Sequence, residues 1–402
     1  SGSGVRELWR NRDFAILWSG EAMSELGSVM TMLVLPLIGY AITGSTAQAG
    51  LATTGVLLGG VVAGLPAGVL VDRWARHRVL LGASLAGAIL YGSLAAAALA
   101  NHLTLAHLVV AGFLGGAAES FFAPATSAAI RKIVPREQLP VAFSQLQARH
   151  HAAQLAGSPL GGALYAVSRG LPFLVDAVSY SVVALAVTRI RTPLPAPERD
   201  AEARGFLAEV REGLGFVWRE PVIRAIMLWG GAINFSVGLV LVTVTLRLVR
   251  VGVHPIAIGA VDAIAVAAAL VGAMVAPWIL SRVRTGAMTI ATGLLLAVVV
   301  VPIAWTNNVV VIGVLLAVGF FLLPANNSGI SAYFVFVVPD RLQGRVNSAS
   351  GFIANGVVPV APVLAGVLIA VAGGRTATLI GAGFVALSLL PLVLSPAVRG
   401  LG

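Results

Sequence analysis

The chain has 402 residues, of which 58% are hydrophobic and only 10% are charged, and its formal net charge is +10. A mean hydropathy of +0.94 excludes an ordinary soluble domain, which needs a polar shell, so we expect lipid to be the solvent. The absence of cysteine excludes a disulfide framework and a thiolate metal site.

Twelve apolar stretches follow one another along the chain, each long enough to cross about 30 Å of hydrocarbon as a helix. The first six lie near residues 14–41, 48–71, 77–100, 105–129, 140–167 and 172–190. The second six lie near 223–249, 256–280, 287–305, 309–336, 347–371 and 375–395. We therefore predict an all-α membrane protein with twelve transmembrane helices.

The two sets of six are related by an internal duplication. Leu17–Glu21 returns as Leu228–Ala232, a shift of 211 residues, and Phe121–Ala125 resembles Phe321–Ala325. Duplicated membrane proteins commonly form a path between their halves. We predict two pseudo-symmetric six-helix bundles, residues 14–190 and 223–395, and a transporter.

Polar segments flank the two predicted bundles. Residues 1–13 are expected to be a tag remnant and a cytoplasmic N-terminus, 191–222 a cytoplasmic linker, and 396–402 a cytoplasmic C-terminus. Within the linker, apolar residues at helical spacing over 206–218 suggest a helix on the inner membrane surface. We nevertheless favour the simpler interpretation, a tether without a packing partner.

Basic residues are concentrated on one side of the predicted spans. All 26 are arginine except Lys132, and most lie at the termini or in connections such as the one between spans two and three. Positive charge marks the cytoplasmic side, so we expect both termini there, in a cell inner membrane. The net charge then reflects topology, and no nucleic-acid partner is expected.

The most specific local motif joins spans two and three. It runs from Gly68 to Arg78 and contains Asp72-Arg73 followed by further basic residues. This motif, the twelve spans and the duplication resemble the major facilitator superfamily. The resemblance implies two bundles that alternate in access, and a cytoplasmic latch of Gly68, Asp72, Arg73, Arg76 and Arg78 that faces residues 344–347. A topological anchor alone is the alternative.

Within that superfamily, three stretches resemble exporters of the macrolide-efflux and enterobactin-exporter type. They are Pro124-Ala125, Val134-Pro135 and residues 157–162. Ser158 stands where the antiporter pattern has proline, and span four lacks the membrane arginine of many drug and proton antiporters. Transport direction and proton coupling therefore have to be argued from this chain's own residues.

Four acids lie well inside predicted spans, namely Glu21, Glu25, Glu119 and Asp262, and Asp176 lies nearer an edge. An acid at mid-span costs roughly 2.5 to 3.5 kcal/mol, so these groups are expected to face water or a partner. Glu21 and Glu25 share one helix face and are hypothesised to share a coupling proton or bind a cationic substrate. Structural hydrogen bonding is the alternative.

Span five carries three residues that could act with these acids, Arg149, His150 and His151. Arg149 could neutralise Glu21, Glu25 or Glu119, or attract an anionic substrate. Adjacent histidines point about 100° apart on a helix, so both cannot face one site well. The pair is a candidate for proton handling, and ordinary hydrogen bonding is the alternative.

Several further side chains could line a permissive substrate cavity, and packing between helices would explain them equally well. They are Met23, Asn234, Phe235, Asn326, Asn327 and Asn355.

The sequence has no phosphate-cradling Gly-rich loop, no metal-spaced cluster and no hydrolase triad, so we expect no enzyme, cofactor or metal. The leading hypothesis is a monomeric, proton-coupled exporter of amphipathic small molecules such as drugs, antibiotics or siderophores, with membrane lipid as its surroundings. A uniporter or importer of a lipid-like or nutrient substrate is the alternative on the same fold. A non-transporting membrane receptor is a remote one.

Overall fold

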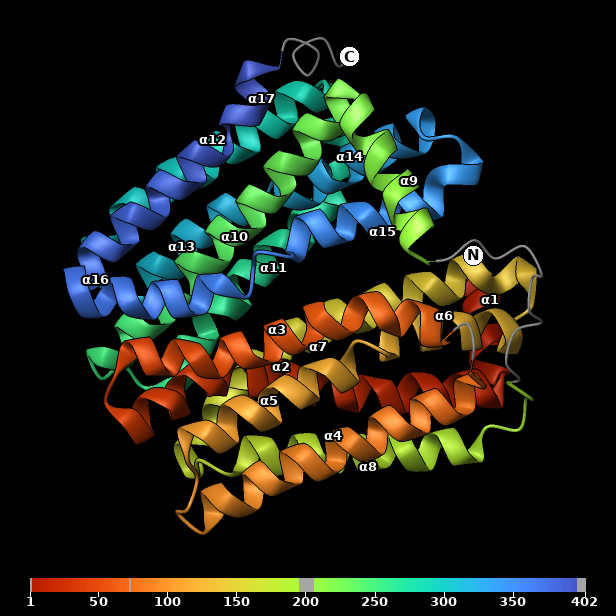
Figure 1. Cartoon of the computed structure of the whole chain (residues 1–402), viewed down its shortest axis with the longest axis horizontal. Helices are drawn as coiled ribbons and strands as arrows, with labels where there is room; N and C mark the ends of the chain where they lie inside the picture. The colour runs from red at the N-terminus through yellow and green to blue at the C-terminus, as the bar shows by residue number, and fades with distance from the viewer. Residues whose placement is uncertain (1, 72–73, 195–205, 396–402) are drawn as a thin grey trace. The chain divides into compact units, whose positions relative to one another are not determined.

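The computed structural model describes residues 2–71, 74–194 and 206–395, and helices are the only extended regular structure there (Figure 1). Ten stretches of these residues are long and apolar enough to cross a membrane. One of them, 349–394, contains Gly373, whose non-helical backbone separates the predicted eleventh and twelfth spans. The all-α membrane prediction is confirmed.

The chain forms two compact units. Unit 1 comprises residues 1–44, 51–201 and 254–259, and unit 2 comprises 45–50, 202–253 and 260–402. The bundle boundaries expected from the sequence stay predictions.

The first half of the chain supplies α1 (Gly2–Arg10), α2 (Arg12–Thr43), α3 (Thr46–Val71), α4 (Arg76–Leu99), α5 (Leu105–Glu119), α6 (Phe122–Ile133), the short 3-10 turn η1 (Arg136–Gln138), α7 (Leu139–Val167) and α8 (Leu171–Arg189). The second half supplies α9 (Phe206–Arg219), α10 (Pro221–Arg250), α11 (Pro255–Leu280), α12 (Thr285–Ile303), α13 (Val309–Phe320), α14 (Leu323–Val337), α15 (Asp340–Asn355), α16 (Val360–Ser388) and α17 (Leu390–Leu394).

The predicted fourth and tenth spans are each broken in two, at corresponding places. α5 ends at Glu119 before α6 begins, and α13 ends at Phe320 before α14 begins. Pro124 and Pro324 explain both breaks, because a proline ring clashes with the carbonyl four residues earlier and offers no N–H to the helix. The duplicated sequence therefore produces a duplicated break, which brings Glu119 to a helix end.

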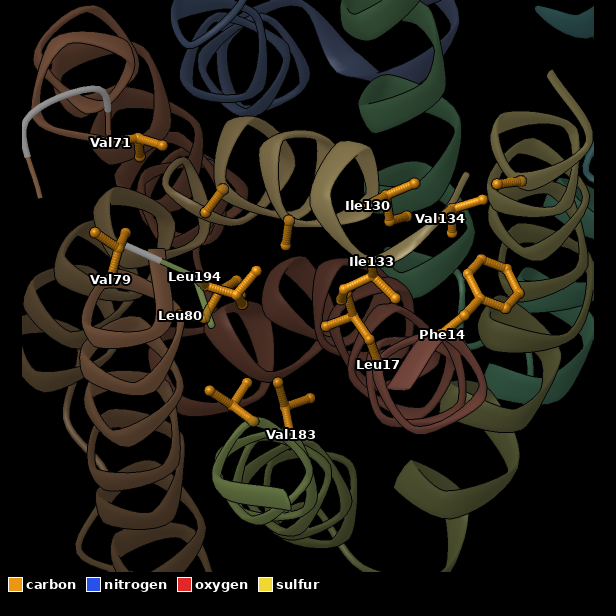
Figure 2. Packing of buried hydrophobic residues seen from close by; sticks show 14 of the residues in the cluster. Phe14, Leu17, Val71, Val79, Leu80, Ile130, Ile133, Val134, Val183 and Leu194 are labelled. Carbon is orange, nitrogen blue, oxygen red and sulfur yellow. The ribbon is translucent and has the colours of Figure 1, made fainter. Parts of the chain in front are cut away.

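In unit 1, α2 packs against α7 and α8, and α4 lies beside α8 (Figure 1). Asn11 caps α2 by accepting from the backbone N–H of Phe14, and its amide donates to the Ile133 carbonyl. Figure 2 shows the core at this end, where Leu17 of α2 lies between Ile133 of α6 and Val183 of α8. This packing holds α2 in place at Leu17, one helical turn before Glu21.

In unit 2, α10 packs against α16, and the linker helix α9 lies along α15 (Figure 1). Val217 of α9 is buried with Ile223, Phe334 and Val346. The linker therefore contains the helix expected near 206–218, and the favoured interpretation of a tether without a packing partner is wrong. Val217 and Phe216 of α9 therefore pack within their own unit.

Unit 2 also buries an arginine. Arg247 of α10 donates to the Ile303 carbonyl at 2.9 Å, the Thr306 carbonyl at 2.6 Å and Thr378 Oγ1 at 3.1 Å. A Cβ on Gly374 would lie 2.7 Å from the Arg247 side chain, so glycine at this position makes room for it. Arg247 thus joins α10 to α16 and to the end of α12.

Candidate functional site

Polar side chains of α2 line a cavity of about 340 Å³ in unit 1. Glu21, Ser24, Glu25 and Ser28 recur at spacings of three and four residues, so they lie along one helix face. The cavity is completed by residues of α5, α6, α7 and α8, which are Glu119, Phe122, Ala123, Thr126, Ser127, Leu146, Gln147, Arg149, His150 and Tyr180. Polar groups predicted from distant parts of the sequence therefore meet in one place.

Arg149 of α7 joins the two glutamates of α2. Its Nη1 donates to Glu21 Oε2 at 2.8 Å, and its Nε donates to Glu25 Oε2 at 2.9 Å. The sequence left open which acid Arg149 neutralises, and the geometry shows that one guanidinium serves both. Such charge-assisted bonds are stronger than neutral ones, and each fixes the rotamer of its partner.

His150 adds a fourth titratable group to this cluster. Its Nδ1 lies 2.5 Å from Glu25 Oε1, and its Nε2 lies 2.9 Å from the amide nitrogen of Gln154. In this orientation of the Gln154 amide, Nε2 accepts from the amide nitrogen, and Nδ1 carries the proton that it donates to Glu25. With this tautomer, which is assigned from the hydrogen bonds, the imidazole is neutral.

The four groups therefore do not balance in charge. The cluster contains two carboxylates, one guanidinium and a neutral imidazole, so it has one more negative charge than positive charges. The His150 side chain is 45% exposed, whereas that of Glu21 is 6% exposed. A proton or another cation can thus reach the cluster from the His150 side.

Thr126 and Trp18 hold the cluster in place. The Thr126 hydroxyl of α6 donates to Glu21 Oε1, and Trp18 Nε1 donates to the Gln145 carbonyl of α7 at 3.1 Å. Neither bond was expected from the sequence. A threonine between apolar residues carries no signal of its own until the packing of α6 against α2 is known.

The remaining ionisable candidates lie at different distances from the cluster. Glu119 lines the same cavity beside Ser28. The ring of His151 is 5.8 Å from that of His150, and His151 is half-buried outside the lining. Asp262 is a half-buried residue of α11 in unit 2. Their roles stay predictions.

The residues expected to line a substrate cavity are spread over several environments. Met23 is 48% exposed and is not among the residues that line the cavity of unit 1. Asn234 donates to the Ala354 carbonyl, and Asn355 donates to Gly351 within its own helix. Asn327 is exposed.

Two other members of that set lie inside unit 2. The ring of Phe235 packs edge-on against Phe384, with centroids 5.6 Å apart. Asn326 is fully buried, and neither polar atom of its amide has a partner among the described residues. A common cavity for this set stays a prediction.

The predicted latch is only partly described. Asp72 and Arg73 lie outside the described residues, Gly68 lies in the last turn of α3, and Arg76 opens α4 as a buried residue. Arg78 is exposed and lines an apolar groove with Trp74. The latch stays a prediction.

Comparison with known proteins shows what this architecture is. A family model of the Major Facilitator Superfamily matches residues 17–359. The chain belongs to the Major Facilitator Superfamily. The resemblance and the superfamily fold expected from the sequence are confirmed, and the protein is a multi-pass membrane transporter, not an enzyme.

Efflux pumps are among its relatives. The chain is 28% identical over 399 residues to the multidrug efflux pump Tap of Mycolicibacterium fortuitum, covering 95% of this chain and 92% of that protein. It is 23% identical over 218 residues to the macrolide efflux protein A of Streptococcus pyogenes, covering 54% of each. The transport and efflux group expected from the sequence is confirmed.

Solved transporter structures share the fold at low identity. The nucleoside transporter NupG superposes with a TM-score of 0.73 at 12% identity, covering 97% of this chain and 100% of that one. A bacterial homologue of the human lysosomal transporter Spinster, in an inward-facing and occupied conformation, gives 0.73 at 14% identity, with 97% of each chain covered.

Proposed function

We propose that this transporter exports amphipathic small molecules in exchange for protons, and that Glu21 and Glu25 bind the proton and the cationic group of the substrate in turn. The observation that carries the proposal is the charge of the cluster. Two carboxylates share a single guanidinium beside a neutral imidazole, at the wall of a cavity.

A buried cluster that lacks one positive charge favours the binding of one. Removing an ion from water costs several kcal/mol unless a partner compensates for it, so uptake of one cation would stabilise the site. A proton on the Glu25–His150 pair would supply that charge, and so would the ammonium of an amphipathic substrate. Because either the proton or the substrate ammonium would supply the missing positive charge, the two compete for the cluster. Such competition is the requirement for exchange.

The cavity suits such a ligand in size and composition. Its volume of about 340 Å³ lies at the lower end of the range for small-molecule sites. Phe122, Leu146 and Ala123 give it apolar surface beside the acids. The relatives named for multidrug and macrolide efflux support export of this class of molecule. Alternating access of the two halves would carry the ligand across the membrane.

Transport in proteoliposomes tests the proposal. We expect wild-type protein to move a macrolide and a fluorescent lipophilic cation against their gradients when a pH difference is imposed. Replacing both acids, as Glu21→Gln with Glu25→Gln, should abolish this pH-driven movement, because neither a proton nor a cation could then bind to a carboxylate beside Arg149. Glu137→Gln is the matched control, since Glu137 is an exposed acid of the same unit.

Two outcomes would contradict the proposal. Unchanged pH-driven transport by the double variant would remove Glu21 and Glu25 from the mechanism. Wild-type protein that only equilibrates its substrate, whatever the pH difference, would be a uniporter.

We also propose that both termini face the cytoplasm, as the distribution of arginines favours. The chain contains no cysteine, so a single introduced cysteine can be labelled without background. In intact cells, a membrane-impermeant maleimide should label His254→Cys, between α10 and α11, but not Glu137→Cys. The reverse pattern would invert the topology.

A further inference from the structure

Among the described residues of unit 1, Asp176 is the most deeply buried acid, and neither the proposed exchange nor the expected site uses it. It lies on α8 with no exposed surface. Thr31 of α2 donates to its Oδ2 at 2.7 Å. Within the described residues, the ion pairs on α2 are those of Glu21 and Glu25, and Asp176 has only hydroxyl partners.

The second carboxyl oxygen has only a weak donor. The Ser179 hydroxyl donates at 2.7 Å to the backbone carbonyl of Asp176 and at 3.5 Å to Asp176 Oδ1, which is long for a hydrogen bond. A serine hydroxyl has one hydrogen, so the shorter bond leaves little of it for Oδ1. A proton on Oδ1 would instead donate to a lone pair of Ser179 Oγ.

The surroundings oppose charge on this carboxyl. Tyr91 of α4 and Tyr180 of α8 are buried next to it, with their rings stacked 5.7 Å apart. Glu119 of α5, which also interacts electrostatically with Asp176, is an acid as well. An isolated carboxylate in an apolar interior is so costly that the group takes up a proton instead.

Polar groups close to this pocket also line the cavity. Tyr180 lines the cavity, and its hydroxyl lies 3.2 Å from Ser28 Oγ. Ser28 in turn lies beside Glu119, and both also line the cavity. Asp176 is one helical turn from Tyr180 on α8. The fully buried Asp176 therefore lies close to residues that line the cavity.

We propose that Asp176 is a second proton-binding site, which holds a proton on Oδ1 in this structure and exchanges it with the cavity by way of Glu119. The inference rests on the proton exchange proposed above. In the exchange step Asp176 Oδ1 loses one proton and the Glu119 carboxylate gains one, so that any hydroxyl between them gives up one proton and takes up another. The charge at Glu21 and Glu25 is thereby linked to an acid outside their cluster.

Infrared spectroscopy of the lipid-reconstituted protein tests the protonation directly. Near neutral pH, wild-type protein should show the C=O stretch of a protonated carboxyl, shifted in D₂O, and Asp176→Asn should lack that band. The asparagine mimics a protonated aspartate, since its nitrogen can donate to Ser179 and its oxygen can accept from Thr31. The melting temperature should therefore stay unchanged. A spectrum in which the variant keeps every protonated-carboxyl band overturns the proposal.

Transport supplies the second measurement. Asp176→Asn should still equilibrate substrate but lose its accumulation under a pH difference, and Glu137→Gln should behave as wild type. Glu119→Gln should keep the Asp176 band and also lose accumulation, which preserves the test if Asp176→Asn folds poorly. Full accumulation by both variants overturns the inference. If wild-type protein ignores the pH difference, the proposed function fails, and the infrared band still decides the protonation of Asp176.

Discussion

Units 1 and 2 both bury an arginine between helices, but the two arginines have different partners. Arg149 faces two carboxylates at the wall of a cavity. Arg247 faces two backbone carbonyls and a threonine hydroxyl, and it packs against Gly374.

The partners of Arg149 can change their charge, whereas the partners of Arg247 cannot. Carbonyl and hydroxyl oxygens do not titrate near neutral pH, so the cation of Arg247 has a fixed environment and acts as a structural anchor. Carboxylates and a histidine can gain or lose protons, so the partners of Arg149 can change with the transport cycle. A buried charge is thus informative about function through its partners rather than through its burial.

The largest effect is expected from removing each arginine. Arg149→Met leaves two carboxylates without their cation and should cost about 3–5 kcal/mol, whereas Arg247→Met leaves neutral acceptors unpaired and should cost about 1–3 kcal/mol. Melting temperatures in detergent measure both. Combining Arg149→Met with Glu21→Gln and Glu25→Gln should recover most of the loss. Equal losses for the two single variants would break the comparison.

A smaller effect is expected from the hydroxyl that donates to Glu21. Thr126→Val removes a bond to a carboxylate and should cost about 1.5–3 kcal/mol. Ser236→Ala in unit 2 removes only a bond to the carbonyl of Ala232 in the same helix and should be near neutral. The same thermal measurement applies. Similar shifts for both variants would show that the Thr126 bond contributes little.

Two glycines at equivalent places of the duplication sharpen the comparison next. A Cβ on Gly27 would lie 2.5 Å from Asp176 Oδ1, but a Cβ on Gly238 would have no neighbour closer than 3.7 Å. Gly27→Ala should therefore cost about 1–3 kcal/mol through overpacking. Gly238→Ala should gain about 0.5–1 kcal/mol, because alanine favours the helix. A harmless Gly27→Ala would mean that Asp176 can move away at little cost.

The smallest effect is expected at Asn326, whose buried amide has no partner among the described residues. Asn326→Val removes an unsatisfied polar group and should stabilise unit 2 by about 1 kcal/mol. Thr126→Val is the matched change at a satisfied position and has the opposite sign. A loss of stability at Asn326 would show that its amide is satisfied after all, for example by ordered water.

Much of the fold follows from the sequence, because apolar length, the internal repeat and the Asp72-Arg73 motif are local signals. The pairing of Glu21 with Glu25 is also local, since four residues make one helical turn. Their contact with Arg149 is not local, because it depends on how α7 is rotated against α2. Thr126 and Gln154 belong to the site for the same reason and carry no sequence signal.

Two features could not be read from the sequence, for simple physical reasons. Spans four and ten are each one candidate membrane span as predicted, but hydropathy averages over a window and hides the break before Pro124 and Pro324. Asp176 received little weight because it lies near the predicted edge of span six. Its burial depends on neighbouring helices, whose arrangement the position of a residue within one span cannot indicate.

The continuity of α2 has a mechanical consequence. Glu21 and Thr31 lie ten residues apart on one unbroken helix, which corresponds to about 15 Å along its axis. The residues between them include no proline, so this segment behaves as a stiff rod. A small slide or roll of the rod, driven by whatever occupies the cavity, would displace the Thr31 hydroxyl from Asp176 at the same moment. Binding of a ligand in the cavity and retention of the proton at Asp176 would thus be coupled through the movement of one helix.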